Sequence, residues 1–185
     1  MKKILLSVAS LAIISTVLSA DKQFFAGIDL AYHNSSATIS GETYSGSDSE
    51  SNVYPSIRAG IIDSDYRVYA RYDIAYDEKV DGIDMSYDSL DLNMEALHIL
   101  APETNLYYGA HIGLGWLAIE GETDNGIQYG VQAGIIQDIN QNFSLEFGLR
   151  YTIATAGFDI TVAGDNAKLE ADSVLTASVG ANYKF

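Results

Sequence analysis

Apolar and polar residues alternate with a period of two along most of the chain after residue 23. This alternation is typical of β-strands whose two faces meet different surroundings. It occurs in eight segments of about ten residues, the length that a tilted strand needs to cross a bilayer. The eight segments span residues 24–33, 53–62, 66–76, 90–100, 106–119, 127–136, 143–153 and 174–185. Clusters of Gly, Ser, Asn and Asp separate the segments and predict turns and loops there.

The two faces of the predicted strands differ in composition. In the first segment one face carries Phe24, Ala26, Ile28, Leu30 and Tyr32, and the other segments repeat this apolar face. The opposite face carries every charge of the segments, five acidic and five basic: Asp29, Arg58, Arg67, Arg71, Asp73, Asp91, Glu95, Glu146, Arg150 and Lys184. It also carries the strand glycines, which suit a crowded and narrow interior.

Which face points inward distinguishes two classes of all-β protein. A soluble ligand-binding barrel places its apolar residues inside and would not expose an apolar band around eight strands. In a membrane barrel the apolar face meets lipid, and closure of the sheet satisfies every backbone group. Aromatic residues near both ends of the strands favour the membrane barrel, because aromatic girdles mark the two lipid–water boundaries. A soluble periplasmic barrel is the alternative.

The charged face then lines the lumen of the barrel. Charges buried in a water-poor lumen need partners, so we expect the ten charged residues to form a network of ion pairs and hydrogen bonds. Within it we expect Glu95 and Glu146 to pair with arginines among Arg58, Arg71 and Arg150.

The connections between the segments alternate in length. The long connections are residues 34–52, 77–89, 120–126 and 154–173, and the short ones are residues 63–65, 101–105 and 137–142. Short periplasmic turns and longer outer loops are typical of a barrel with both termini in the periplasm. The sequence therefore predicts an eight-stranded antiparallel up-and-down transmembrane β-barrel. The β-prone residues 38–40 and 158–162 are expected to extend strands above the membrane.

The first twenty residues read as a secretory signal. Lys2 and Lys3 precede an apolar run over residues 4–17, and Leu18-Ser19-Ala20 supplies the small residues of a cleavage site. We therefore expect a cleaved signal peptide over residues 1–20 and an outer-membrane barrel domain over residues 21–185. The predicted location is the bacterial outer membrane.

Charge and composition narrow the function. The full chain carries a net charge of −15 and no cysteine, which excludes disulfides and thiolate metal sites and argues against nucleic acid as a partner. Fifteen of the 25 acidic residues fall in the four long connections, where only Lys79 and Lys168 oppose them. These carboxylates either bridge through divalent cations to lipopolysaccharide or form a solvated acidic surface. No cofactor, metal or catalytic site is predicted.

The C-terminal segment carries a more specific signal. Ser178, Gly180, Tyr183 and Phe185 supply a polar residue, a glycine two positions on, and aromatics at the third-last and last positions. This pattern resembles the assembly signal of the small eight-stranded outer-membrane β-barrels of Gram-negative bacteria, similar to the transmembrane domain of outer membrane protein A. The resemblance covers the whole chain after the signal and points to the single-domain type. It implies that the outer-membrane assembly machinery reads these four residues, and that outer-membrane lipid and lipopolysaccharide surround the barrel.

An eight-stranded barrel has an interior just wide enough for side chains to fill. We therefore expect a non-enzymatic protein with a filled lumen, acidic surface loops, and a structural or surface-interaction role. The alternatives are a narrow gated, porin-like channel and an adhesin. Some eight-stranded relatives modify lipid A through a His-x-Ser pair, and His33-Asn34-Ser35 matches that pair. This activity is disfavoured because His33 falls on the luminal face and no carboxylate partner is evident.

Overall fold

The computed structural model describes most of the chain beyond the predicted signal peptide. The described residues are 22–41, 45–74, 78–80, 83–119, 122–155, 157–162 and 165–185. The predicted signal peptide, residues 1–20, lies outside them. Within the described residues, no helix is long and apolar enough to span a membrane.

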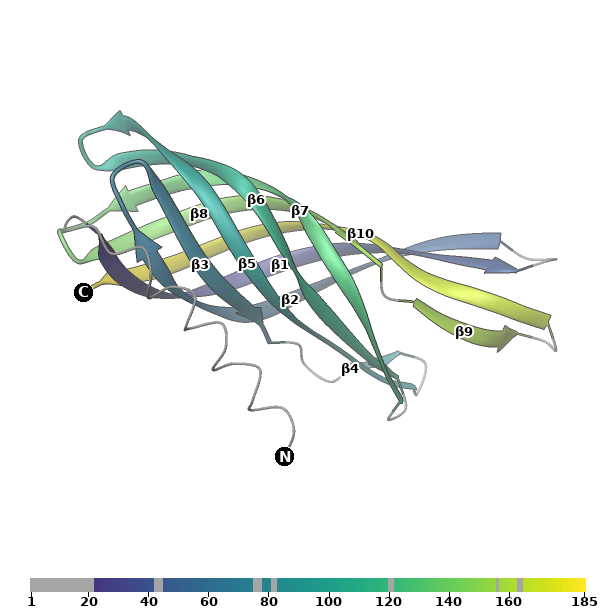
Figure 1. Ribbon diagram of the computed structural model, residues 1–185. Helices are drawn as coiled ribbons and strands as arrows, with labels where there is room; N and C mark the ends of the chain where they lie inside the picture. The colour runs from purple at the N-terminus through teal and green to yellow at the C-terminus, as the bar shows by residue number, and fades with distance from the viewer. Residues whose placement is uncertain are drawn as a thin grey trace.

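The described residues form ten strands, and eight of these close into a barrel (Figure 1). The strands are β1 (Gln23–Gly41), β2 (Ser45–Ile62), β3 (Tyr66–Asp73), β4 (Glu78–Val80), β5 (Ile83–Ala101), β6 (Thr104–Ile119), β7 (Glu122–Asp138), β8 (Phe143–Ala154), β9 (Gly157–Val162) and β10 (Asp165–Lys184). The barrel follows the order β1-β2-β3-β5-β6-β7-β8-β10, and antiparallel pairing of β1 with β10 closes it. This confirms the predicted eight-stranded antiparallel barrel.

The alternation of side chains gives the barrel an apolar outer surface and a polar interior. Phe24 exposes 51% of its surface, whereas its neighbour Phe25 exposes 3% and points inward. Exposed Leu, Ile, Val, Phe and Tyr side chains occur on all the barrel strands but β3, and eight of the ten charged residues of the predicted segments are buried inside. Because this is the reverse of a soluble barrel, the faces are assigned as the sequence pattern predicts.

The strands run further than predicted at the end of the barrel that lies opposite the C-terminus, which we call the outer end (Figure 1). Residues 34–41 and 45–52 were expected in a loop, but they continue β1 and β2 and pair with each other. The reason is that each residue added to a paired strand satisfies backbone hydrogen bonds, even where Ser and Asp have low strand propensity. At the opposite, inner end, the predicted turn at residues 63–65 is present.

A four-stranded sheet projects beyond the barrel at the outer end. It has the order β2-β1-β10-β9, with Ser40 of β1 opposite Lys168 of β10 and Lys168 opposite Asp159 of β9. In Figure 1 these two hairpins reach well past the other strands. A shift in the β1–β10 register between Ser36 and Ala37 marks the base of the sheet. Residues 38–40 extend β1 as predicted, whereas residues 158–162 lie in a separate strand, β9, that pairs with β10.

Candidate functional site: the polar interior of the barrel

The innermost layer of the interior is built around Arg67 of β3. Its Nε contacts Glu95 of β5, and its Nη1 and Nη2 donate to the two carboxylate oxygens of Glu146 of β8 at 2.6 and 2.8 Å. Each of the three residues exposes 2% of its surface or less. A guanidinium that meets a carboxylate through two parallel hydrogen bonds is one of the stronger polar contacts in proteins. The layer therefore ties strands on opposite sides of the barrel together.

Three aromatic rings surround the same guanidinium. The Arg67 carbon Cζ lies 4.5, 5.0 and 5.9 Å from the ring centres of Tyr107, Tyr69 and Phe25. The Tyr69 hydroxyl also donates to Glu95 at 2.7 Å. These aromatics are not among the residues predicted for the lumen, although they fall on the same alternating positions of their strands as the charged residues. Together with the ion pairs, they fill the lumen at this level.

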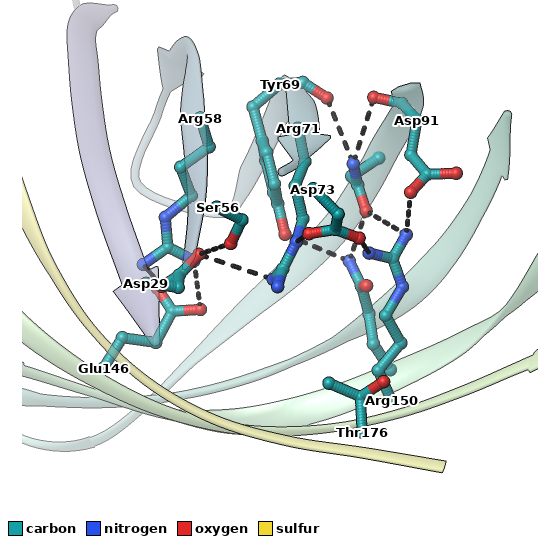
Figure 2. A network of polar contacts seen from close by, with 12 residues as sticks. Asp29, Ser56, Arg58, Tyr69, Arg71, Asp73, Asp91, Glu146, Arg150 and Thr176 are labelled. Carbon is teal, nitrogen blue, oxygen red and sulfur yellow. Dashed lines mark hydrogen bonds and ion pairs between the residues drawn. The ribbon is translucent and has the colours of Figure 1, made fainter. Parts of the chain in front are cut away.

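A second layer links Arg58 of β2 to two carboxylates. Its Nη1 donates to Glu146 at 2.7 Å, and its Nη2 lies 2.9 Å from Asp29 (Figure 2). Asn182 accepts a hydrogen bond from the Arg58 Nε at 2.9 Å. Asp29 in turn lies 3.4 Å from Arg71, so that this layer connects to the next one.

The third layer lies toward the outer end and contains Arg71, Asp73, Asp91 and Arg150. Arg71 donates to Asp73 at 2.7 Å, and Arg150 donates to Asp91 at 2.9 Å. Arg150 also donates to the His111 ring, and Figure 2 shows it beside Asp91 and Asp73, away from Glu146. The interior is thus one connected network that runs from Glu95 to Asp91.

The predicted pairs are correct in one case and wrong in another. Glu146 pairs with Arg58 as expected, but the partner of Glu95 is Arg67, which was not among the candidate arginines. The reason is the register, which places Arg67 directly opposite Glu95 on neighbouring strands. Lys184 lies apart from the buried layers and pairs with Asp138 at 2.6 Å near the inner end.

Glycines provide the space that the charged side chains occupy. A Cβ atom on Gly113 of β6 would collide with the Asp91 carboxylate and with the backbone oxygen of Leu90. A Cβ atom on Gly180 would likewise collide with the carboxylate of Asp29. A side chain at either position would have to displace a buried carboxylate.

The residues of the predicted assembly signal lie on β10 and at its end. Gly180 is buried, whereas Tyr183 and Phe185 expose 50% and 71% of their surface. Their rings meet edge to face at 5.1 Å, and Ser178 lies on the luminal face of the same strand. The two aromatics are therefore accessible from outside the barrel.

The histidines do not form a catalytic arrangement. His33 Nδ1 lies 2.9 Å from the Thr176 hydroxyl, and no hydrogen bond between His33 and Ser35 occurs in the described part of the chain. His111 hydrogen-bonds to Thr152 and Arg150 inside the lumen, and His98 is exposed on the outer surface. Among the described residues, no group of three His, Asp or Glu is placed to hold a metal ion.

Comparison with known proteins supports the fold. Neither the known protein-family models nor the curated proteins give a match. Among solved structures, Neisserial surface protein A matches with a TM-score of 0.65 at 22% identity, over 88% of this chain and 97% of that one. OprG of Pseudomonas aeruginosa matches with a TM-score of 0.63 at 10% identity, over 88% and 96% of the two chains. OprH of P. aeruginosa matches with a TM-score of 0.59 at 26% identity, over 88% and 99%.

These three neighbours are small outer-membrane barrels, and this chain shares their fold. The resemblance drawn from its C-terminal segment is thus confirmed at the level of the fold. The neighbours also support a location in the bacterial outer membrane.

Proposed function

We propose that the protein is a non-enzymatic outer-membrane barrel whose lumen is sealed and whose outer sheet makes surface contacts. The observation that carries the sealed lumen is the layer around Arg67. Ion pairs to Glu95 and Glu146 and the rings of Tyr69 and Tyr107 fill the cross-section there. A lumen filled in this way supports a structural protein rather than a diffusion pore.

Recording from purified protein in planar bilayers tests the sealed lumen. The expected result is no stable conductance step for the wild-type protein. A matched pair of variants sharpens the test, because Arg67→Ala removes the centre of the layer, whereas Lys184→Ala removes a half-buried ion pair at the inner end. Stable steps of nanosiemens size in wild type would favour the narrow channel instead.

The apolar outer surface supports contact with outer-membrane lipid and lipopolysaccharide. The accessible Tyr183 and Phe185 fit the proposal that the assembly machinery recognises the end of β10. Membrane fractionation and heat-modifiable migration on a gel separate a membrane barrel from a soluble one.

Mass spectrometry of the membrane form tests cleavage of the signal peptide after Ala20. Replacement of both terminal aromatics, Tyr183 and Phe185, is expected to lower the amount of protein inserted in the membrane. Normal insertion of that variant would contradict the assembly signal.

The outer sheet supports a surface-interaction role. Among the described strands, β9 pairs only with β10, and residues 45–54 of β2 pair only with β1. Two strand edges therefore present backbone groups that another chain could pair with. Removal of residues 157–170 tests this, because it takes away β9 with its open edge and the outer part of β10, and it leaves the part of β10 that pairs with β8 from Ser173 onward. Unchanged adhesion of expressing cells to host cells and to other bacteria would remove the support for this role.

A further inference from the structure

A small cavity lies at the outer end of the interior, beyond the third layer. Its volume is about 90 Å3, which is room for a small ion or a few water molecules. The residues around it include His33, Asp73, Tyr87, Asp91, Gln128 and Arg150. Toward the inner end the lumen is filled by the Arg58 and Arg67 layers, so a ligand can enter only from the outer side.

The cavity borders an interior network that, taken as a whole, carries an excess of negative charge. The described interior has five carboxylates, on Asp29, Asp73, Asp91, Glu95 and Glu146, and four guanidinium groups, on Arg58, Arg67, Arg71 and Arg150. A buried charge without a counter-charge is costly, so one further positive charge would stabilise the network. The acidic outer connections raise the local concentration of cations at the same end of the barrel.

A second observation, independent of the charge count, comes from His33. This residue lines the cavity and exposes only 9% of its surface, and its Nε2 has no hydrogen-bond partner within the described part of the protein. Its other ring nitrogen, Nδ1, is already engaged with Thr176 at 2.9 Å. A buried polar atom without a partner is uncommon and calls for a ligand. When Nδ1–H donates to Thr176, the Nε2 lone pair is free to accept a hydrogen bond.

The chemistry of the lining selects the class of ligand. A metal ion is disfavoured because no group of three His, Asp or Glu in the described residues is placed to hold one. An anion is disfavoured because Asp73 and Asp91 border the space and Arg150 is already bound to Asp91. The class of ligand that remains complementary to the lining is a cation that donates hydrogen bonds to separate acceptors.

We infer that this cavity binds a small monovalent cation of the ammonium or primary alkylammonium class from the outer side. The cation donates to the Asp73 carboxylate and to His33 Nε2, and it supplies the missing positive charge. Its binding fixes the His33 tautomer that carries the proton on Nδ1.

Titration of the refolded barrel in detergent micelles with methylammonium chloride tests this inference. The barrel carries 15N-labelled histidine, a buffer keeps the pH constant, and sodium chloride keeps the ionic strength constant. The expected result is a saturable shift of the His33 Nε2 resonance. Tetramethylammonium has the same charge but no N–H group, so it should give no saturable shift. No response to methylammonium, or an equal response to tetramethylammonium, would overturn the inference.

Variants locate the site. Asp73→Asn removes a charged acceptor and should weaken methylammonium binding by about tenfold or more. Asp138→Asn is the matched control, because this carboxylate lies at the inner end and pairs with Lys184, and it should leave the affinity unchanged. Since Asp73 also holds Arg71, His33→Gln provides a second variant that leaves the ion pairs intact, with the backbone amide shift of Gln128 in uniformly 15N-labelled protein as the readout. Unchanged affinity in both site variants would refute the site.

Discussion

The inner and outer ends of this barrel differ in how completely their polar groups are paired. Around Arg67 each charged group has its partners, and the glycine positions and the aromatic rings leave no room for rearrangement. At the outer end the four-stranded sheet has two open edges, and His33 has an unpartnered ring nitrogen beside a cavity. The inner layers therefore join strands across the lumen, whereas the outer end carries the groups that are available to bind.

The balance of positive and negative charge also differs between the two ends. The charged groups of the inner layers all have partners of opposite charge within a connected network, because a buried charge without a partner would be costly. The long connections, by contrast, hold fifteen acidic residues against two lysines. Charge that is solvated costs little, so acidity can accumulate there without affecting the fold.

The largest expected effect comes from breaking the inner layer. Arg67→Met keeps most of the side-chain volume but leaves Glu95 and Glu146 without their shared partner, and should lower the free energy of unfolding by about 3–5 kcal/mol. Denaturant unfolding followed by fluorescence of the single tryptophan, Trp116, measures this in detergent or lipid.

Lys184→Met is the control for that measurement, because it also removes an ion pair but at a half-buried site near the inner end. Its expected cost is about 1 kcal/mol or less. Equal losses in the two variants would show that the Arg67 layer has no special part in stability.

A smaller effect is expected from filling one of the glycine positions. In Gly113→Val the new side chain would collide with Asp91 and with the Leu90 backbone, so we expect a loss of about 1–3 kcal/mol. Ala110→Val on the same strand is the matched control, because Ala110 is exposed on the lipid-facing surface. If the two variants had the same unfolding free energy, the glycines would not be needed to make space for the network.

The sequence was sufficient to predict the barrel because its main signal is local. Alternation assigns Phe24 to the outer surface and Asp29 to the lumen without knowledge of any partner strand. The partner of Glu95 could not be predicted in that way, because it depends on the register between β3 and β5, and a shift of two residues would preserve the alternation while changing the pairs. The same alternation places Phe25, Tyr69 and Tyr107 on the luminal face. The residues predicted for that face, however, were only the charged residues and the glycines.

The outer end was predicted less well for a physical reason. Residues 34–41 have few apolar positions, so hydrophobic periodicity could not distinguish a strand from a loop there. What makes them a strand is pairing with β2 and β10 on both sides, which is a non-local effect. The lack of a partner for His33 Nε2 is also a non-local effect, because it depends on which groups from five or more strands surround this atom.

The smallest expected effect comes from removing one edge of the outer sheet. Deletion of residues 157–170 leaves residues 155, 156, 171 and 172 to join β8 to the part of β10 that pairs with it from Ser173 onward. Four residues suffice for a hairpin connection, and none of the ion pairs of the inner layers is touched. We therefore expect the free energy of unfolding to change by less than about 1 kcal/mol, in contrast to Arg67→Met. A loss as large as that of Arg67→Met would show that the outer sheet stabilises the barrel. The proposed difference between the two ends would then be wrong.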